Sequence, residues 1–61
     1  MPKLIRLSAV RGLTGLSRSS IYADPNFPKS VKIGHRAVAW VEEEIADWIS
    51  ARIQERDPAS Y

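Results

Sequence analysis

A run of hydroxyl, cationic and aromatic side chains between residues 17 and 22 has the chemistry of a surface that contacts nucleic acid. Serine hydroxyls can bond to phosphate oxygens or base edges, and Arg18 can bind guanine through two hydrogen bonds or hold a phosphate. The hydroxyl of Tyr22 can reach a phosphate, unless its ring lies half-buried against a neighbouring element. An ordinary helix pair with a serine-rich cap explains the same run equally well. The candidate contact residues are Ser17, Arg18, Ser19, Ser20 and Tyr22.

A second group of basic side chains follows between residues 29 and 36, on a segment with the pattern of a β-hairpin. Cations on a hairpin can lie along a phosphate backbone or enter a minor groove. Lysines also protect the edges of a solvated hairpin, which is the alternative explanation. This group comprises Lys29, Lys32, His35 and Arg36.

The charges of the 61-residue chain are unevenly distributed, although its net charge is only +2. Residues 1–36 hold seven basic residues and one acidic residue, a net of +6. Residues 37–61 hold two basic and six acidic residues, a net of −4. This asymmetry indicates that the basic half binds a polyanion, with solvated surface charge as the alternative. Both basic groups must face one duplex for the first interpretation to hold.

Few residues in the chain support catalysis or metal binding. There is no cysteine, His35 is the only histidine, and no glycine-rich phosphate-binding loop is present. The acids Glu42 to Glu44 fan around a helix start, so they do not form a paired acid–base site. We therefore expect a protein that is not an enzyme and needs no metal or cofactor. Because no apolar run is long enough to span a bilayer, we also expect a cytoplasmic protein without membrane contact.

The serine-rich run is expected to lie on two short helices joined by a tight turn. Ser8 is the predicted N-cap of a helix over residues 9–13, which ends at Thr14-Gly15. Ser17 is the predicted N-cap of a second helix over residues 18–23, which a proline soon stops. Such a helix-turn-helix projects the first residues of its second helix into the major groove.

A hairpin follows the two helices. Strands over residues 31–33 and 37–41 are expected to reverse at Gly34-His35. A loop of two or four residues would leave Lys32 on the face opposite to the apolar one. Residues 3–7 form a short edge strand or an extended lead-in. The apolar face would carry Val31, Ile33, Val38 and Trp40.

Apolar residues three and four apart predict a final helix over about residues 42–55, with its glutamates at the positive end of the dipole. Trp40 and Trp48 are in phase with apolar faces, so we expect core residues rather than base-stacking surfaces. The tail, residues 57–61, is expected to fray. The predicted core consists of Leu7, Val10, Leu13, Leu16, Ile21, Phe27, Val31, Ile33, Val38, Trp40, Ile45, Trp48, Ile49 and Ile53.

Several short motifs, in this order, resemble the AlpA family of phage-type regulators. They are Thr14–Tyr22, Phe27–Lys29, Val31–Gly34, Arg36–Trp40, Glu44-Ile45 and Trp48-Ile49. The resemblance covers residues 4–54. It implies a winged-helix fold similar to excisionases and to the DNA-binding domains of MerR-type regulators. It also implies DNA binding linked to prophages or integrated elements, with residues 17–22 in the major groove and Lys29, Lys32 and Arg36 on the wing. The second helix is short, because only four residues separate Tyr22 from Phe27.

These features predict a small α+β winged helix-turn-helix in a single domain over residues 1–61. The helix-turn-helix would cover about residues 8–24, the two-stranded wing about 27–41 and the C-terminal helix about 42–55.

The main functional hypothesis is a sequence-specific regulator of transcription that binds double-stranded DNA and controls prophage or integrated-element genes. One alternative is a recombination directionality factor that bends DNA for an integrase. Another is a protein-interaction module that uses the acidic final helix. A module of this size buries little surface on one DNA site. We therefore expect a homodimer or a cooperative assembly on DNA.

Overall fold

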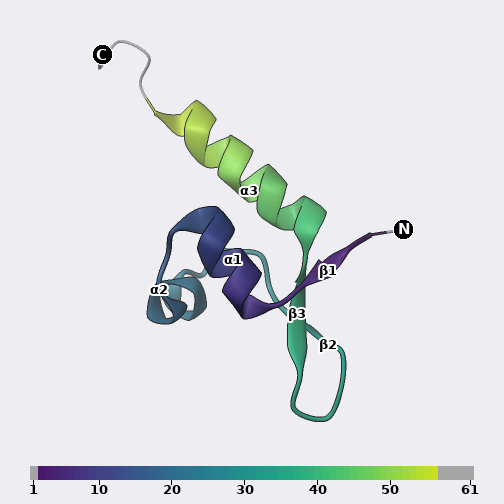
Figure 1. Cartoon of the computed structure of the whole chain (residues 1–61). Coiled ribbons are helices and arrows are strands. Elements are labelled where there is room, and N and C mark those ends of the chain that lie inside the picture. The colour runs from purple at the N-terminus through teal and green to yellow at the C-terminus, as the bar shows by residue number, and fades with distance from the viewer. Residues whose placement is uncertain (1, 57–61) are drawn as a thin grey trace.

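Residues 2–56, which the computed structural model describes, fold into three helices and a three-stranded antiparallel sheet (Figure 1). This α+β arrangement is consistent with the predicted winged helix-turn-helix. The β2–β3 loop projects away from the helices, and α3 runs in the opposite direction (Figure 1). The tail that was expected to fray lies outside the described residues. The elements are β1 (Leu4–Ile5), α1 (Leu7–Thr14), α2 (Arg18–Ala23), β2 (Val31–Lys32), β3 (Val38–Val41) and α3 (Glu42–Glu55).

The central strand of the sheet is β3, with β1 on one side and β2 on the other. Ile5 pairs with Trp40, so the amino-terminal segment does form an edge strand. The backbone N–H of Glu42 donates to the carbonyl of Lys3 at 2.8 Å, which joins the start of α3 to that strand. The sheet thus has one strand more than the predicted two-stranded wing.

Helix α1 begins at Leu7, two residues before the predicted start, and its N-cap is Arg6. Ser8 lies within the first turn, so the prediction that Ser8 caps this helix is wrong. The carbonyl of Arg6 accepts the N–H groups of Ala9 and Val10, both at 3.1 Å. The chain enters the helix as soon as its pairing with β3 ends, which leaves no room for a later start.

The helix α1 ends as predicted at Gly15, whose φ of +72° lies in the left-handed region. We expect Gly15→Ala to lower the free energy of unfolding by about 1 kcal/mol, because a Cβ strains this conformation. Gly12→Ala is the matched control, since Gly12 is helical and an added Cβ meets no atom within 4 Å at either site. That control should raise the free energy of unfolding by about 0.5–1 kcal/mol. Urea denaturation followed by circular dichroism measures both changes, and effects of the same sign would contradict this account.

Helix α2 has the predicted bounds. The Oγ of Ser17 accepts the N–H of Ser20 at 3.2 Å, which confirms Ser17 as the N-cap. At the other end Asp24 is extended, as expected for a residue before proline. The carboxylate of Asp24 accepts the N–H of Asn26 at 2.8 Å, so the predicted turn is present. This turn carries the chain from α2 towards the hairpin.

The register of the β2–β3 hairpin differs from the predicted one. Lys32 lies opposite Val38, and the N–H of Ile33 donates to the carbonyl of Ala37 at 3.0 Å. The loop therefore has three residues rather than two or four. A shift of one residue moves every side chain of a strand to the other face. Lys32 consequently shares a face with Val38 and Trp40, and the prediction that it faces away from them is wrong.

Buried side chains from β1, from the three helices, from the segment before β2 and from β3 meet in one core. Trp40 is 1% exposed and is the largest of them. Trp48 packs against this core and lies edge-on to Phe27, with ring centroids 4.9 Å apart. The predicted packing of both tryptophans is therefore confirmed. The core residues are Ile5, Val10, Ile21, Phe27, Trp40 and Ile45, with Leu7, Leu16, Val38, Trp48 and Ile49 packed against them.

Four residues predicted in the core are exposed: Leu13, Val31, Ile33 and Ile53. The hairpin register explains Val31 and Ile33, because it turns them to the face of the sheet opposite Trp40. The other two lie near the C-terminal ends of α1 and α3, where little of the chain covers them. The core instead includes Ile5, and Ala39 is fully buried on the central strand.

Candidate nucleic-acid interface

Three arginines from separate parts of the chain line one surface hollow of about 350 Å³. Arg6 precedes α1, Arg18 is the first residue of α2, and Arg36 lies in the loop between β2 and β3. All three are exposed, and the lining contains no acidic residue. We call this the arginine hollow. Its lining residues are Arg6, Leu7, Ser8, Arg18, Tyr22, Arg36 and Val38.

The face of α2 that borders the hollow carries Arg18 and Tyr22. They are four residues apart and therefore lie on the same side of the helix. The guanidinium carbon of Arg18 is 5.4 Å from the centre of the Tyr22 ring. That ring meets Trp40 edge-on, with centroids 6.0 Å apart, and Tyr22 remains 53% exposed. Tyr22 thus packs half-buried against the hairpin, which is one of the two placements predicted for it. Its ring also contacts the guanidinium of Arg18.

The three serines at the start of α2 differ in whether their hydroxyls are hydrogen-bonded. The hydroxyls of Ser17 and Ser20 lie 3.0 Å apart and bond to each other, within the N-cap. Ser20 also lines a separate hollow with Trp48 and Arg52, on the side of α2 that faces α3. Ser19 is exposed, and its hydroxyl makes no hydrogen bond to another residue of the described range 2–56. Of the three predicted serine contacts, Ser19 is the one whose hydroxyl is not engaged.

The hairpin side chains lie at different distances from the arginine hollow. Arg36 lines it directly. Lys32 pairs across the sheet with Val38, a lining residue, so its side chain lies on the face next to the hollow. His35 is exposed at the centre of the three-residue loop and is not part of the lining. The corrected register therefore adds Lys32 to the same basic face as Arg18.

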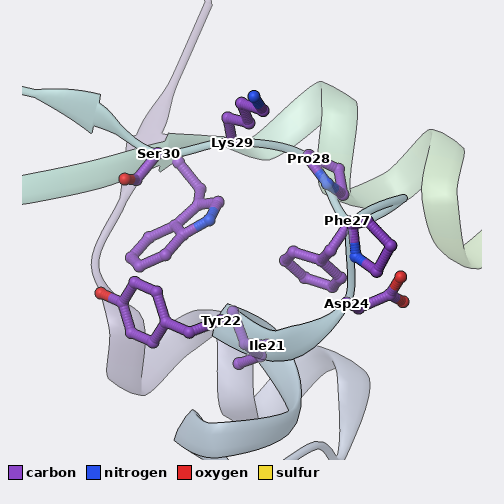
Figure 2. Close-up of a pocket in the computed structure, with 9 residues that line it drawn as sticks. Ile21, Tyr22, Asp24, Phe27, Pro28, Lys29 and Ser30 are labelled. Carbon is purple, nitrogen blue, oxygen red and sulfur yellow. The ribbon is translucent and has the colours of Figure 1, made fainter.

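Lys29 lies away from the arginine hollow. Figure 2 shows its side chain pointing outward from the segment before β2, away from the rings of Tyr22 and Phe27. It also lines a groove with Glu44 and Asp47 of α3. Of the other predicted contact residues within the range 2–56, Lys29 shares a hollow only with Tyr22, and it does not line the arginine hollow.

The arginines of the hollow form no ion pair with any residue between 2 and 56. Arg52 in α3 differs, because its guanidinium lies 3.6 Å from Asp24 and 3.0 Å from Glu55. Lys3 similarly lies 3.8 Å from Glu42. The carboxylates Asp24, Glu42 and Glu55 thus pair with other cations, and within residues 2–56 no carboxylate pairs with an arginine of the hollow.

Reasoning from the sequence did not identify Arg6 and Ser8 as site residues. Arg6 belongs to the basic half of the chain, but it lies in no recognisable motif. Only the pairing of β1 with β3 brings the start of α1 beside the hairpin. Within residues 2–56, no group of His, Asp or Glu side chains gathers to hold a metal ion. In the same part of the chain, every helix is too short or too polar to cross a membrane.

Comparison with known proteins gives two similar chains and one family. The family described as prophage CP4-57 regulatory protein (AlpA) matches residues 3–53. The DNA-binding transcriptional activator AlpA of Escherichia coli (strain K12) is 37% identical over 59 aligned positions, and the match covers 82% of this chain and 84% of that protein. An uncharacterized protein of Enterobacteria phage P4 is 39% identical over 57 aligned positions, and the match covers 88% of this chain and 65% of that protein. No solved structure gives a significant match.

Proposed function

The chain belongs to the AlpA family of prophage regulatory proteins, and from this premise we propose that it binds double-stranded DNA and regulates transcription. The observation that carries the proposal is the arginine hollow. It brings Arg18 of α2 and Arg36 of the hairpin loop to one surface without an acidic residue in its lining. A duplex that meets this surface would contact the second helix and the wing together.

The proposed docking places the first residues of α2 in the major groove and the β2–β3 loop along the neighbouring backbone. Arg18 and Ser19 would approach base edges, because both are exposed at the start of the helix. Arg36, Lys32 and His35 would supply the wing contacts. Lys29 does not line the arginine hollow and is not assigned a contact in this docking.

Selection of bound DNA from a random pool at physiological salt tests this function. We expect an enriched short sequence, and binding to it that weakens steeply as salt rises, because phosphate contacts release counterions. Gel shifts with the enriched duplex and an unrelated duplex would then measure the preference. Equal weak binding to both duplexes would contradict the proposal.

The regulated genes, in this proposal, belong to a prophage or another integrated element, and the protein acts in the cytoplasm. A recombination directionality factor would use the same DNA surface. An excision assay with an integrase encoded beside the gene separates the two roles, since only the recombination factor raises excision directly. Because the module is small, we further propose that it binds as a homodimer or in a cooperative assembly. Sedimentation with and without the enriched duplex tests this.

The acidic face of α3 favours a second candidate, a protein-interaction module. Glu43, Glu44 and Asp47 are exposed and form no ion pair with a residue in the range 2–56. Two of them border an apolar groove that also contains Phe27 and Val31. If this surface carries the function, exchanging Arg18 and Lys32 for alanine should leave reporter regulation unchanged.

A further inference from the structure

We infer that the arginine hollow binds one phosphate of the DNA backbone through Arg6 and Arg36. The inference rests on the proposed function and adds to it a contact residue, Arg6, that lies outside the helix-turn-helix and the wing. The hollow's volume of about 350 Å³ is roughly ten times the share of one liquid water molecule, so it admits a phosphate with part of its solvent.

The chemistry of the lining suits a phosphate. A guanidinium forms two parallel, charge-assisted hydrogen bonds to phosphate oxygens. Arg6 and Arg36 reach the hollow from the β1–α1 junction and from the hairpin loop, so a phosphate between them would be held from two elements. The hydroxyl of Ser8 lies in the same lining and adds a neutral donor.

The charge balance supports an anionic occupant. Three guanidinium groups in one hollow repel each other, and no carboxylate in the described part of the chain pairs with them. Because all three are exposed, water and salt weaken this repulsion without removing it. A bound phosphate would neutralise part of the charge. The charge of Arg52, by contrast, is already neutralised by two carboxylates.

The contact would also orient the protein on its site. Phosphate contacts determine register on the duplex, whereas base contacts determine sequence preference. A phosphate held by Arg6 and Arg36 would place α2, and with it Arg18, at the edge of the groove. Arg6 is therefore a positioning contact. Its loss should lower the affinity for every DNA sequence.

The first test compares Arg6→Ala with Arg11→Ala on the enriched duplex and on an unrelated duplex. Arg11 is the matched control, because it is an exposed arginine of α1 outside the hollow. We expect Arg6→Ala to weaken binding to both duplexes about 10-fold and to reduce the salt slope by about 1. Arg11→Ala should have little effect, and Arg6→Lys should recover part of the loss. Equal losses for the two alanine variants would overturn the inference.

The second test locates the phosphate itself. Neutral methylphosphonate groups are placed singly along the enriched duplex. One position should weaken wild-type binding more than it weakens Arg6→Ala or Arg36→Ala binding, because each variant has already lost one of the two guanidinium groups that hold the phosphate. If every position weakens the wild type and both variants by the same factor, the hollow holds no phosphate. Wild-type binding without sequence preference would instead refute the proposed function, so the two failures are distinguishable. Circular dichroism confirms that each variant is folded.

Discussion

Replacing Trp40 with alanine is expected to remove a large part of the protein's free energy of unfolding. Trp40 is 1% exposed, and truncating a buried tryptophan costs about 3–5 kcal/mol. A chain of 61 residues is expected to have a total stability of only about 3–9 kcal/mol. The loss would also affect the site, because Tyr22 packs edge-on against Trp40 and lies beneath Arg18. DNA binding should therefore weaken together with the fold.

Circular dichroism during thermal and urea denaturation measures this effect. Leu13→Ala is the control, because its exposure of 54% predicts a change within about 0.5 kcal/mol. The two variants also test whether Leu13 lies outside the core, because the spacing of apolar residues had predicted that it is buried. A Trp40→Ala variant that loses no more stability than Leu13→Ala, or a Leu13→Ala variant that unfolds, would contradict the described core.

Arg18→Ala is expected to have the largest effect on recognition, with the fold intact. Arg18 is exposed at the start of α2, and its guanidinium lies over the ring of Tyr22. The side chain is therefore already oriented in the protein without DNA. If Arg18 binds a guanine, its loss should weaken binding to the enriched duplex by about 1–3 kcal/mol. Binding to an unrelated duplex should weaken much less.

Gel shifts at one fixed salt concentration give both affinities. Arg6→Ala serves as the comparison, because the phosphate contact proposed for it predicts equal losses on the two duplexes. A repeated selection with Arg18→Ala should show relaxed preference at a single base pair. Equal losses on both duplexes would mean that Arg18 contacts a phosphate instead of a base.

Local signals in the chain were sufficient to predict most of the elements. Gly15 ends α1 because only glycine adopts φ of +72° without strain, and this property acts within one turn. Ser17 caps α2 through a bond to an amide three residues away. The apolar spacing in α3 reports burial on one face of a single helix, and the bounds of α3 matched the prediction. Each of these features depends on neighbours within about four residues.

The hairpin register could not be predicted from the same kind of signal. Loops of two, three and four residues are all compatible with Gly34-His35-Arg36, and strand pairing across the sheet selects one of them. Because side chains alternate along a strand, that choice determined whether Lys32 faces Trp40 or the opposite side. Errors in the predicted core at Val31 and Ile33 have the same cause.

The sequence by itself determined the charge of the amino-terminal half, the helix-turn-helix and the apolar stripe of the last helix, because these are properties of composition and of contacts near in the chain. Only the tertiary structure decided that Arg6, Arg18 and Arg36 share one hollow. Their meeting depends on β1 pairing with β3 and on α1 and α2 packing against the same strand. Such contacts join residues up to 37 positions apart, as in the pairing of Leu4 with Val41, and no local pattern encodes the distance between them.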